Sequence, residues 1–149
     1  MVGYYGNDAA TADTLTQDGY VRTGDLAELD GKGGFTFLGR MGDVLRLSGF
    51  LVNPLEIEMH IQKLPAIEGC QTIAVARPGG VRAVSFVTLK AGAALDEAAV
   101  IEHCKRGLAN YKVPVRVFPI DDFPKTPSPN GFKIQRTKLR EMAEGLLKA

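Results

Sequence analysis

The sequence predicts an α+β fold, with a small mixed, largely antiparallel sheet of about three strands flanked by helices. A β-hairpin and a short two-stranded ribbon are expected to precede this sheet. Two patterns support the prediction: short alternating apolar runs are separated by glycine-rich turns, and capping residues precede apolar residues at helical spacing. With 149 residues and a hydrophobic share of 45%, the chain can bury the core of one ordinary domain.

The first part of the chain contains two predicted hairpin-like segments. In residues 23–40, alternating runs flank "DGKGG", whose glycines can supply the positive φ that a tight turn needs. Residues 44–52, "VLRLSGFLV", indicate a shorter ribbon bent at Gly49.

A helix is expected to follow directly, with Asn53 as its N-cap and Pro54 in its first position. Glu56 is expected to close a capping box. The buried stripe of this helix is predicted to contain Ile57, Ile61 and Leu64.

The remaining elements alternate between strands and helices. Residues 70–78 and 81–90 indicate two strands of a hairpin, and Asp96 begins a helix with Val100, Ile101, Cys104 and Leu108 at helical spacing. A third strand is predicted in residues 115–120. A loop around Lys133 then leads to a last helix that starts near Arg136.

Charge and cysteine content exclude several classes of protein. Eighteen basic and seventeen acidic residues give a net charge of +1, so neither a nucleic-acid partner nor an anionic membrane is expected. Cys70 and Cys104 are expected to be reduced thiols rather than a disulfide or zinc ligands. No apolar run approaches the roughly 18 residues of a membrane span, and the first residues lack the pattern of a signal peptide. The expected location is the cytoplasm.

Four short motifs are unremarkable when each is taken alone. Gly-Asp in "RTGD" fits a turn with local hydrogen bonds, and Arg40 fits an exposed arginine. Gly49 in "SGF" fits a β-bulge, and Lys133 fits a solvated lysine.

The order of these motifs carries more information. "DGYVRTGDLAELD", "GGFTFLGRMGDVLRLSGFLVNPLEIE", "LANYKVPVRV" and "FPKTPSPNGFKIQRTKLRE" follow one another along the chain. In this order they resemble the C-terminal part of the adenylate-forming enzymes, which include acyl- and aryl-CoA synthetases, peptide-synthetase adenylation domains and firefly luciferase. The resemblance covers essentially the whole chain.

The resemblance implies roles for three charged residues. Asp25 matches an aspartate that accepts hydrogen bonds from the ribose hydroxyls of ATP, which suits an acceptor-only carboxylate. Arg40 matches an arginine that also contacts the ribose. Lys133 matches the adenylation lysine, whose ammonium group stabilises negative charge between the acyl carboxylate and the α-phosphate. In this reading Pro127, Pro129 and Gly131 shape a loop that presents Lys133 to another domain.

The resemblance also implies a domain organisation. Residues 1–41 match the tail of a large N-terminal adenylation domain, residues 42–43 a hinge, and residues 44–149 a mobile C-terminal domain. In such enzymes this domain rotates between two half-reactions. Gly49, with Ser48 beside it, matches the turn next to the pantetheine channel, where a residue without Cβ allows close approach.

The sequence departs from the family pattern at three places. Gly42 stands where the family usually has aspartate or lysine, although glycine can accept large φ/ψ changes. Phe132 separates Gly131 from Lys133; Lys133 is still preferred over Lys125 and Lys138 because "KIQR" continues the motif. The segment 75–84 is shorter than the usual loop.

The implied function is that of a C-terminal fragment of an ATP-dependent acyl-CoA synthetase that is inactive alone. ATP and CoA are the expected cosubstrates, a carboxylic acid the substrate and the N-terminal adenylation domain the partner. The chain has no phosphate loop, so the Mg site is expected in that missing domain and no metal site here. The alternatives are a ligase that loads a carrier protein and a non-catalytic binding module with the same fold.

Several other residues receive no functional assignment. His60 and His103 are expected to be surface or boundary residues of their helices. Arg136 and Arg140, at i, i+4 spacing, fit a solvated stripe. Contacts with CoA phosphates are conceivable for them and for Arg77, Arg82 and Lys105.

Overall fold

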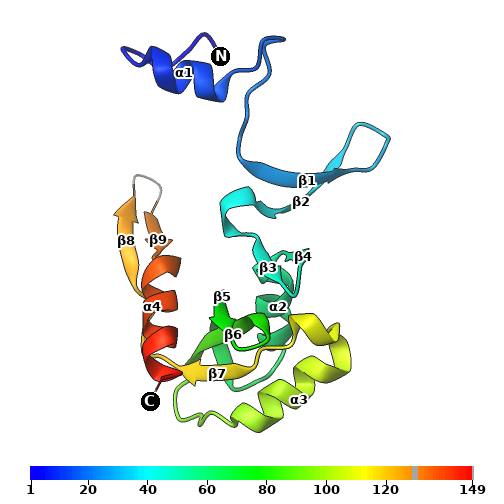
Figure 1. Cartoon of the computed structure of the whole chain (residues 1–149), viewed down its shortest axis with the longest axis vertical. Helices are drawn as coiled ribbons and strands as arrows, with labels where there is room; N and C mark the ends of the chain where they lie inside the picture. Colours follow the sequence, from blue (N-terminus) through cyan, green and yellow to red (C-terminus); the bar gives the residue numbers. More distant parts are fainter. Residues whose placement is uncertain (129–130, 149) are drawn as a thin grey trace. The chain divides into compact units, whose positions relative to one another are not determined.

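The structure is a computed structural model that describes residues 1–128 and 131–148, with the backbone alone described for Leu38, Ser128 and Gly131. The chain divides into two compact units, Met1–Asp43 and Val44–Ala149. The α-helices and strands of each unit are labelled in Figure 1.

The first unit contains α1 (Asp8–Thr14), β1 (Asp25–Leu29), β2 (Phe35–Arg40) and η1 (Met41–Asp43). β1 and β2 pair antiparallel, which confirms the predicted hairpin. Its turn is closed by the Asp30 carboxylate, which accepts hydrogen bonds from the backbone N–H groups of Lys32 and Gly34. Helix α1 was not predicted, because its sequence, DAATADT, has no apolar stripe. In agreement with this, none of its residues is buried.

The second unit is built on the sheet β5 (Ile67–Arg77), β6 (Gly80–Leu89) and β7 (Arg116–Pro119), in the order β5-β6-β7. β5 and β6 are antiparallel, whereas β7 runs parallel to β6. β3 (Leu45–Leu47) and β4 (Phe50–Val52) form the predicted ribbon. The α+β class and the small mixed sheet are thereby confirmed.

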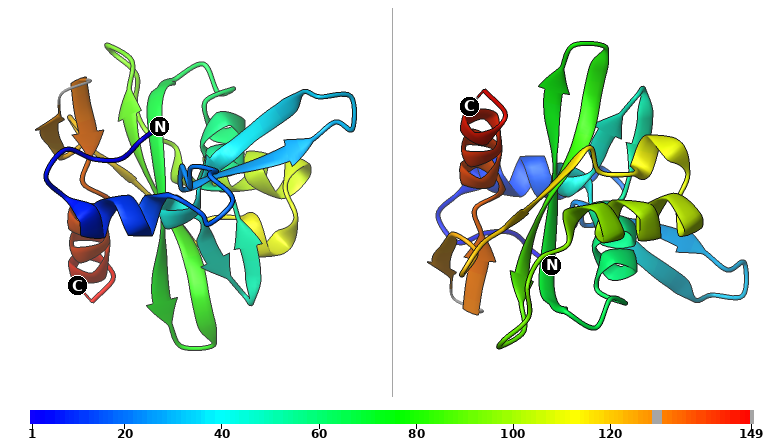
Figure 2. Two further views of the ribbon diagram at one scale, coloured as in Figure 1. Left: turned by 90° about the horizontal axis from the view of Figure 1, so that it is seen from above. Right: turned by 90° about the horizontal axis from the view of Figure 1, so that it is seen from below.

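Helices cover both faces of this sheet. α2 (Pro54–Ile61) and α3 (Glu97–Gly107) lie on one side of β5 and β6 and α4 (Arg136–Leu146) on the other, as Figure 2 shows. Because side chains alternate along a strand, each face has its own apolar cluster. The α2/α3 side buries Cys70, Ala83, Val87, Ile57, Ile61, Val100 and Cys104. The α4 side buries Ile73, Val75, Val84, Phe86, Leu139 and Ala143.

The predicted helix starts are confirmed, with one correction. The side chains of Asn53 and Asp96 accept hydrogen bonds from the backbone N–H groups of Leu55 and Ala99. The capping box at Glu56 was wrong: the Glu56 carboxylate instead accepts hydrogen bonds from Lys112 Nζ at 2.6 and 2.8 Å. Lys112 belongs to η2 (Asn110–Lys112), so this contact depends on the tertiary fold.

The segment around Lys133 was predicted as a loop and is instead an antiparallel hairpin. β8 (Lys125–Ser128) pairs with β9 (Gly131–Ile134), and Lys133 lies opposite Thr126. Pro127 is part of β8, a position that proline tolerates in a ribbon with free edges. Pro129, to which a loop-forming role was given, lies outside the described residues.

Side chains cover the outer edge of β5, which has β6 as its only strand neighbour in the described sheet. Glu58 Oε1 accepts a hydrogen bond from the N–H of Thr72 at 2.8 Å, and Arg136 Nη1 donates to the carbonyl of Thr72 at 2.8 Å. Arg136 Nη1 also lies 3.2 Å from Glu58 Oε1, and Glu58 is only 3% exposed. Arg140 Nε donates to the carbonyl of Ala74 at 3.1 Å. α2 and α4 are thus both bonded to the same strand edge.

The two histidines join α2 to α3. Their rings stack with centroids 4.3 Å apart, and each Nε2 donates to the backbone carbonyl of the other residue. Both are half-buried, which agrees with the expected boundary position. A Cβ on Gly107 would clash with the His60 ring, so the glycine leaves space for the two stacked histidines.

No helix in residues 1–128 or 131–148 has the length and apolar character needed to cross a membrane.

Candidate functional site

The first hairpin brings Asp25 and Arg40 together. They are paired residues at the start of β1 and the end of β2, and Arg40 Nε lies 3.2 Å from an Asp25 carboxylate oxygen. The side chain of Asp25 is 33% exposed and that of Arg40 is 67% exposed. The carboxylate therefore keeps access to solvent and can accept hydrogen bonds from a hydroxylated ligand.

The segment assigned to the hinge is a single 3₁₀ turn, Met41–Asp43, at the end of the first unit. Gly42 does not have a positive φ, and a Cβ added there would meet nothing within 4 Å. This conformation therefore does not itself require glycine at position 42.

The turn between β3 and β4 has an unusual backbone. Gly49 has φ +90°, and Ser48 has φ +51°, a value that costs free energy in a residue with a Cβ. A Cβ on Gly49 would meet nothing within 4 Å. The positive φ alone explains the glycine, and the open space beside it can admit a ligand close to the backbone.

Lys133 is exposed on β9. The hairpin that carries it is fixed at its base, where the N–H of Gln135 donates to the carbonyl of Pro124 at 2.8 Å. Beside it, the Gln135 side-chain amide donates to Thr126 Oγ1. Lys133 thus lies on a hydrogen-bonded pair of strands, and its neighbour Phe132 is also exposed.

The predicted residues therefore occur in separate places: one pair in the first unit, and one turn and one hairpin in the second. In the described residues, no group of three or more His, Cys, Asp or Glu side chains could hold a metal ion.

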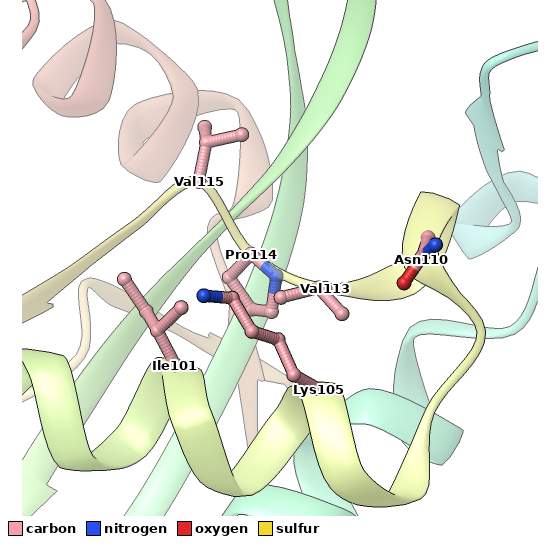
Figure 3. Close-up of a pocket in the computed structure, with 6 residues that line it drawn as sticks. All are labelled: Ile101, Lys105, Asn110, Val113, Pro114 and Val115. Carbon is pink, nitrogen blue, oxygen red and sulfur yellow. The ribbon is translucent and has the colours of Figure 1, made fainter.

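An open groove of about 350 Å³ lies between α3 and the segment that leads into β7 (Figure 3). It is lined by Ile101, Lys105, Asn110, Val113, Pro114 and Val115. Asp25, Arg40, Ser48, Gly49 and Lys133 all lie outside it.

Two arginines expected to be solvated have structural partners instead. Arg136 and Arg140 bind the edge of β5, as described above. Glu58, the acidic partner of Arg136, was not among the residues predicted from the sequence. A usable signal existed, because Glu58 follows Ile57 directly and lies three residues before Ile61 on the apolar side of α2.

Comparison with known proteins agrees with this architecture. The family model described as the AMP-binding enzyme C-terminal domain matches residues 56–129. A long-chain-fatty-acid–CoA ligase of Escherichia coli O6:H1 is 34% identical over 145 residues, which cover 97% of this chain and 25% of the ligase. A mitochondrial medium-chain acyl-CoA ligase of Rattus norvegicus is 32% identical over 149 residues, 99% of this chain and 24% of the relative.

Solved structures give the same result. ATP-bound MatB from Rhodopseudomonas palustris has a TM-score of 0.82 and 32% sequence identity, over 97% of this chain and 28% of MatB. Fold and sequence thus define the class as the C-terminal part of an adenylate-forming enzyme. The chain belongs to the AMP-binding enzyme family, and it carries that family's C-terminal domain. It spans about a quarter of the length of the curated relatives it matches.

Proposed function

We propose that this chain is the C-terminal part of an ATP-dependent acyl-CoA synthetase. In the first half-reaction a carboxylate oxygen attacks the α-phosphate of ATP, which forms an acyl-adenylate and releases pyrophosphate. In the second, the thiol of CoA loses its proton and attacks the acyl carbonyl, which forms the thioester and releases AMP. The observation that carries this proposal is the exposed Asp25–Arg40 pair within a chain similar to CoA ligases along nearly its whole length.

Each residue has a separate task in this scheme. Asp25 accepts hydrogen bonds from the ribose hydroxyls. Arg40 also contacts the ribose, and its Nε lies 3.2 Å from the Asp25 carboxylate. Lys133 brings its ammonium group between the acyl carboxylate and the α-phosphate, where negative charge concentrates in the transition state. Ser48 and Gly49 border the path of the pantetheine arm in the second half-reaction.

The Lys133 assignment is tested in the full-length enzyme. Lys133→Ala should slow adenylation by roughly two orders of magnitude or more, the scale for loss of a preorganised charge contact. It should spare thioester formation from a supplied acyl-adenylate. Lys138→Ala, which removes an exposed lysine of α4, is the matched control. An equal fall in both half-reactions would mean that Lys133 is structural.

The isolated chain is expected to make no acyl-adenylate, because it lacks a phosphate loop and supplies one cation and one ribose contact. Pyrophosphate exchange with fatty and aromatic acids should remain at background. Clear exchange would contradict the assignment of the triphosphate and magnesium sites to an N-terminal domain.

The hinge proposal is tested at Gly42. Proline fixes φ at about −65° and restricts the preceding residue, so Gly42→Pro should trap the adenylation arrangement. In single turnovers, acyl-adenylate should then accumulate while CoA consumption falls. Unchanged thioester rates would place the rotation elsewhere, with Asp43 the next candidate.

The acceptor thiol can be CoA or the phosphopantetheine of a carrier protein, because both present the same arm to the Ser48–Gly49 turn. Offering CoA and a loaded carrier protein to the full-length enzyme distinguishes them. A reading frame upstream of Met1 without a phosphate loop would favour a non-catalytic binding module instead.

A further inference from the structure

The Ser48–Gly49 turn needs an external support. Among the described residues, Ser48 is the only non-glycine residue with a positive φ. Such a backbone state persists only where the surrounding structure holds it. The supporting contacts should therefore be visible around Ser48.

Arg82 provides this support from the neighbouring turn. Its Nη1 donates to Ser48 Oγ at 2.7 Å and to the carbonyl of Val81 at 3.3 Å, and its Nη2 donates to the carbonyl of Gly79 at 3.1 Å. The N–H of Ser48 also donates to the carbonyl of Val81 at 3.4 Å. The planar guanidinium thus ties the β3–β4 turn to the β5–β6 turn with a fixed geometry.

We propose that Arg82 is a positioning residue for thioester formation. It holds Ser48 at positive φ, which sets the orientation of the peptide before Gly49 along the path of the pantetheine arm. This inference rests on the proposed function. It assigns Arg82 an effect through Ser48 rather than a contact with CoA.

A direct contact of Arg82 with a CoA phosphate would produce a similar loss of activity. The positioning role and the phosphate contact can be distinguished by comparing two acceptors, because pantetheine has the same thiol arm as CoA but no phosphate. A positioning residue affects both acceptors, whereas a phosphate contact affects CoA alone.

The experiment uses the full-length enzyme with a supplied acyl-adenylate. Arg82→Gln should lower kcat/KM for both CoA and pantetheine by roughly ten- to a hundredfold, because a misplacement of about 1 Å at a reacting site can cost about a hundredfold. It should leave adenylation unchanged. Arg82→Lys should recover part of the loss. An ammonium group can reach Ser48 Oγ, but it does not reproduce the planar set of donors with which the guanidinium binds both turns. Arg77→Gln is the control, because it removes the same charge from the same hairpin and Arg77 contacts the carbonyl of Leu147 instead.

A readout without catalysis accompanies these rates. In the 149-residue chain, the amide of Ser48 should exchange its hydrogen faster in Arg82→Gln than in wild type or Arg77→Gln.

Three outcomes would overturn the inference: a loss with CoA but not with pantetheine, no loss with either acceptor, or unchanged exchange at Ser48. If the wild-type enzyme formed no thioester from the acyl-adenylate, the proposed function itself would fail, and the positioning role of Arg82 with it. The wild-type rate thus distinguishes the two failures.

Discussion

The two units of the chain are stabilised in different ways. In Val44–Ala149, buried hydrophobic side chains fill both faces of the central sheet. In Met1–Asp43, no buried hydrophobic side chain occurs among those described, and Leu29, Phe35 and Phe37 are exposed on the hairpin. The comparison indicates that the second unit carries the stability of this chain. We expect the exposed face of the first hairpin to be covered by further protein.

The largest difference between the two units is expected when the acidic residue of an ion pair is replaced by alanine in each of them. Glu58→Ala should lower the free energy of unfolding by about 3–5 kcal/mol, because Arg136 loses its buried partner and the N–H of Thr72 loses its acceptor. Asp25→Ala breaks an exposed pair and should cost about 0–1 kcal/mol. Urea unfolding followed by circular dichroism measures both. Equal losses would contradict the comparison.

A smaller effect is expected from truncating leucines. Leu139 is fully buried between α4 and the sheet, so Leu139→Ala should cost about 2–5 kcal/mol through lost burial and a cavity. Leu29 is 79% exposed, and Leu29→Ala should stay within about 0.5 kcal/mol. A large loss for Leu29→Ala would reveal an apolar core in the first unit.

Adding one methyl group sharpens the comparison further. Gly107→Ala places a Cβ against the His60 ring and should cost about 1–3 kcal/mol, as overpacking does. Gly42→Ala meets open space without a positive φ and should change stability by less than about 0.5 kcal/mol. If Gly107→Ala has the same urea midpoint of unfolding as the wild type, the two histidine rings move aside without a cost in stability.

The last expected effect is a dependence of stability on pH, which arises in the second unit alone. Burial raises the pKa of Cys70 to about 12 and the pKa of Cys104 to about 11. Because both values exceed the unfolded value of about 8.5, ionisation of the thiols does not change the stability below that pH. Above it, ionisation favours the unfolded chain, by up to about 1.4 kcal/mol per thiol for each pH unit.

Urea midpoints between about pH 7.5 and 9.5 measure this slope. A Cys70→Ala, Cys104→Ala double variant should lose part of it. Parallel pH curves for the double variant and the wild type would show that the thiols do not contribute.

Local sequence patterns were sufficient for most elements of the fold. The Asp30 turn, the Asn53 and Asp96 caps and the alternation in β5 and β6 each depend on residues close together in sequence. Helix α1 lacks an apolar stripe, and the pairing of β8 with β9 was hidden by prolines that usually mark turns.

The candidate site was predictable only in part. Asp25, Arg40, Gly49 and Lys133 were found through a resemblance between motifs. The partners of Arg82, Arg136 and Glu56 could not be found in this way, because their contacts join residues 34, 78 and 56 positions apart. A local pattern can indicate that Glu58 is buried on the apolar side of α2, but it does not identify the residue with which Glu58 pairs.

The coverage of the β5 edge by Glu58, Arg136 and Arg140 has a consequence for self-association. An unpaired strand edge is a template on which another chain can add a strand. Here the outward backbone groups of Thr72 and Ala74 already bind side chains of α2 and α4. A second molecule would have to displace a buried carboxylate and two guanidinium groups before it could extend the sheet. These three side chains therefore oppose fibril growth through β5 in concentrated solution.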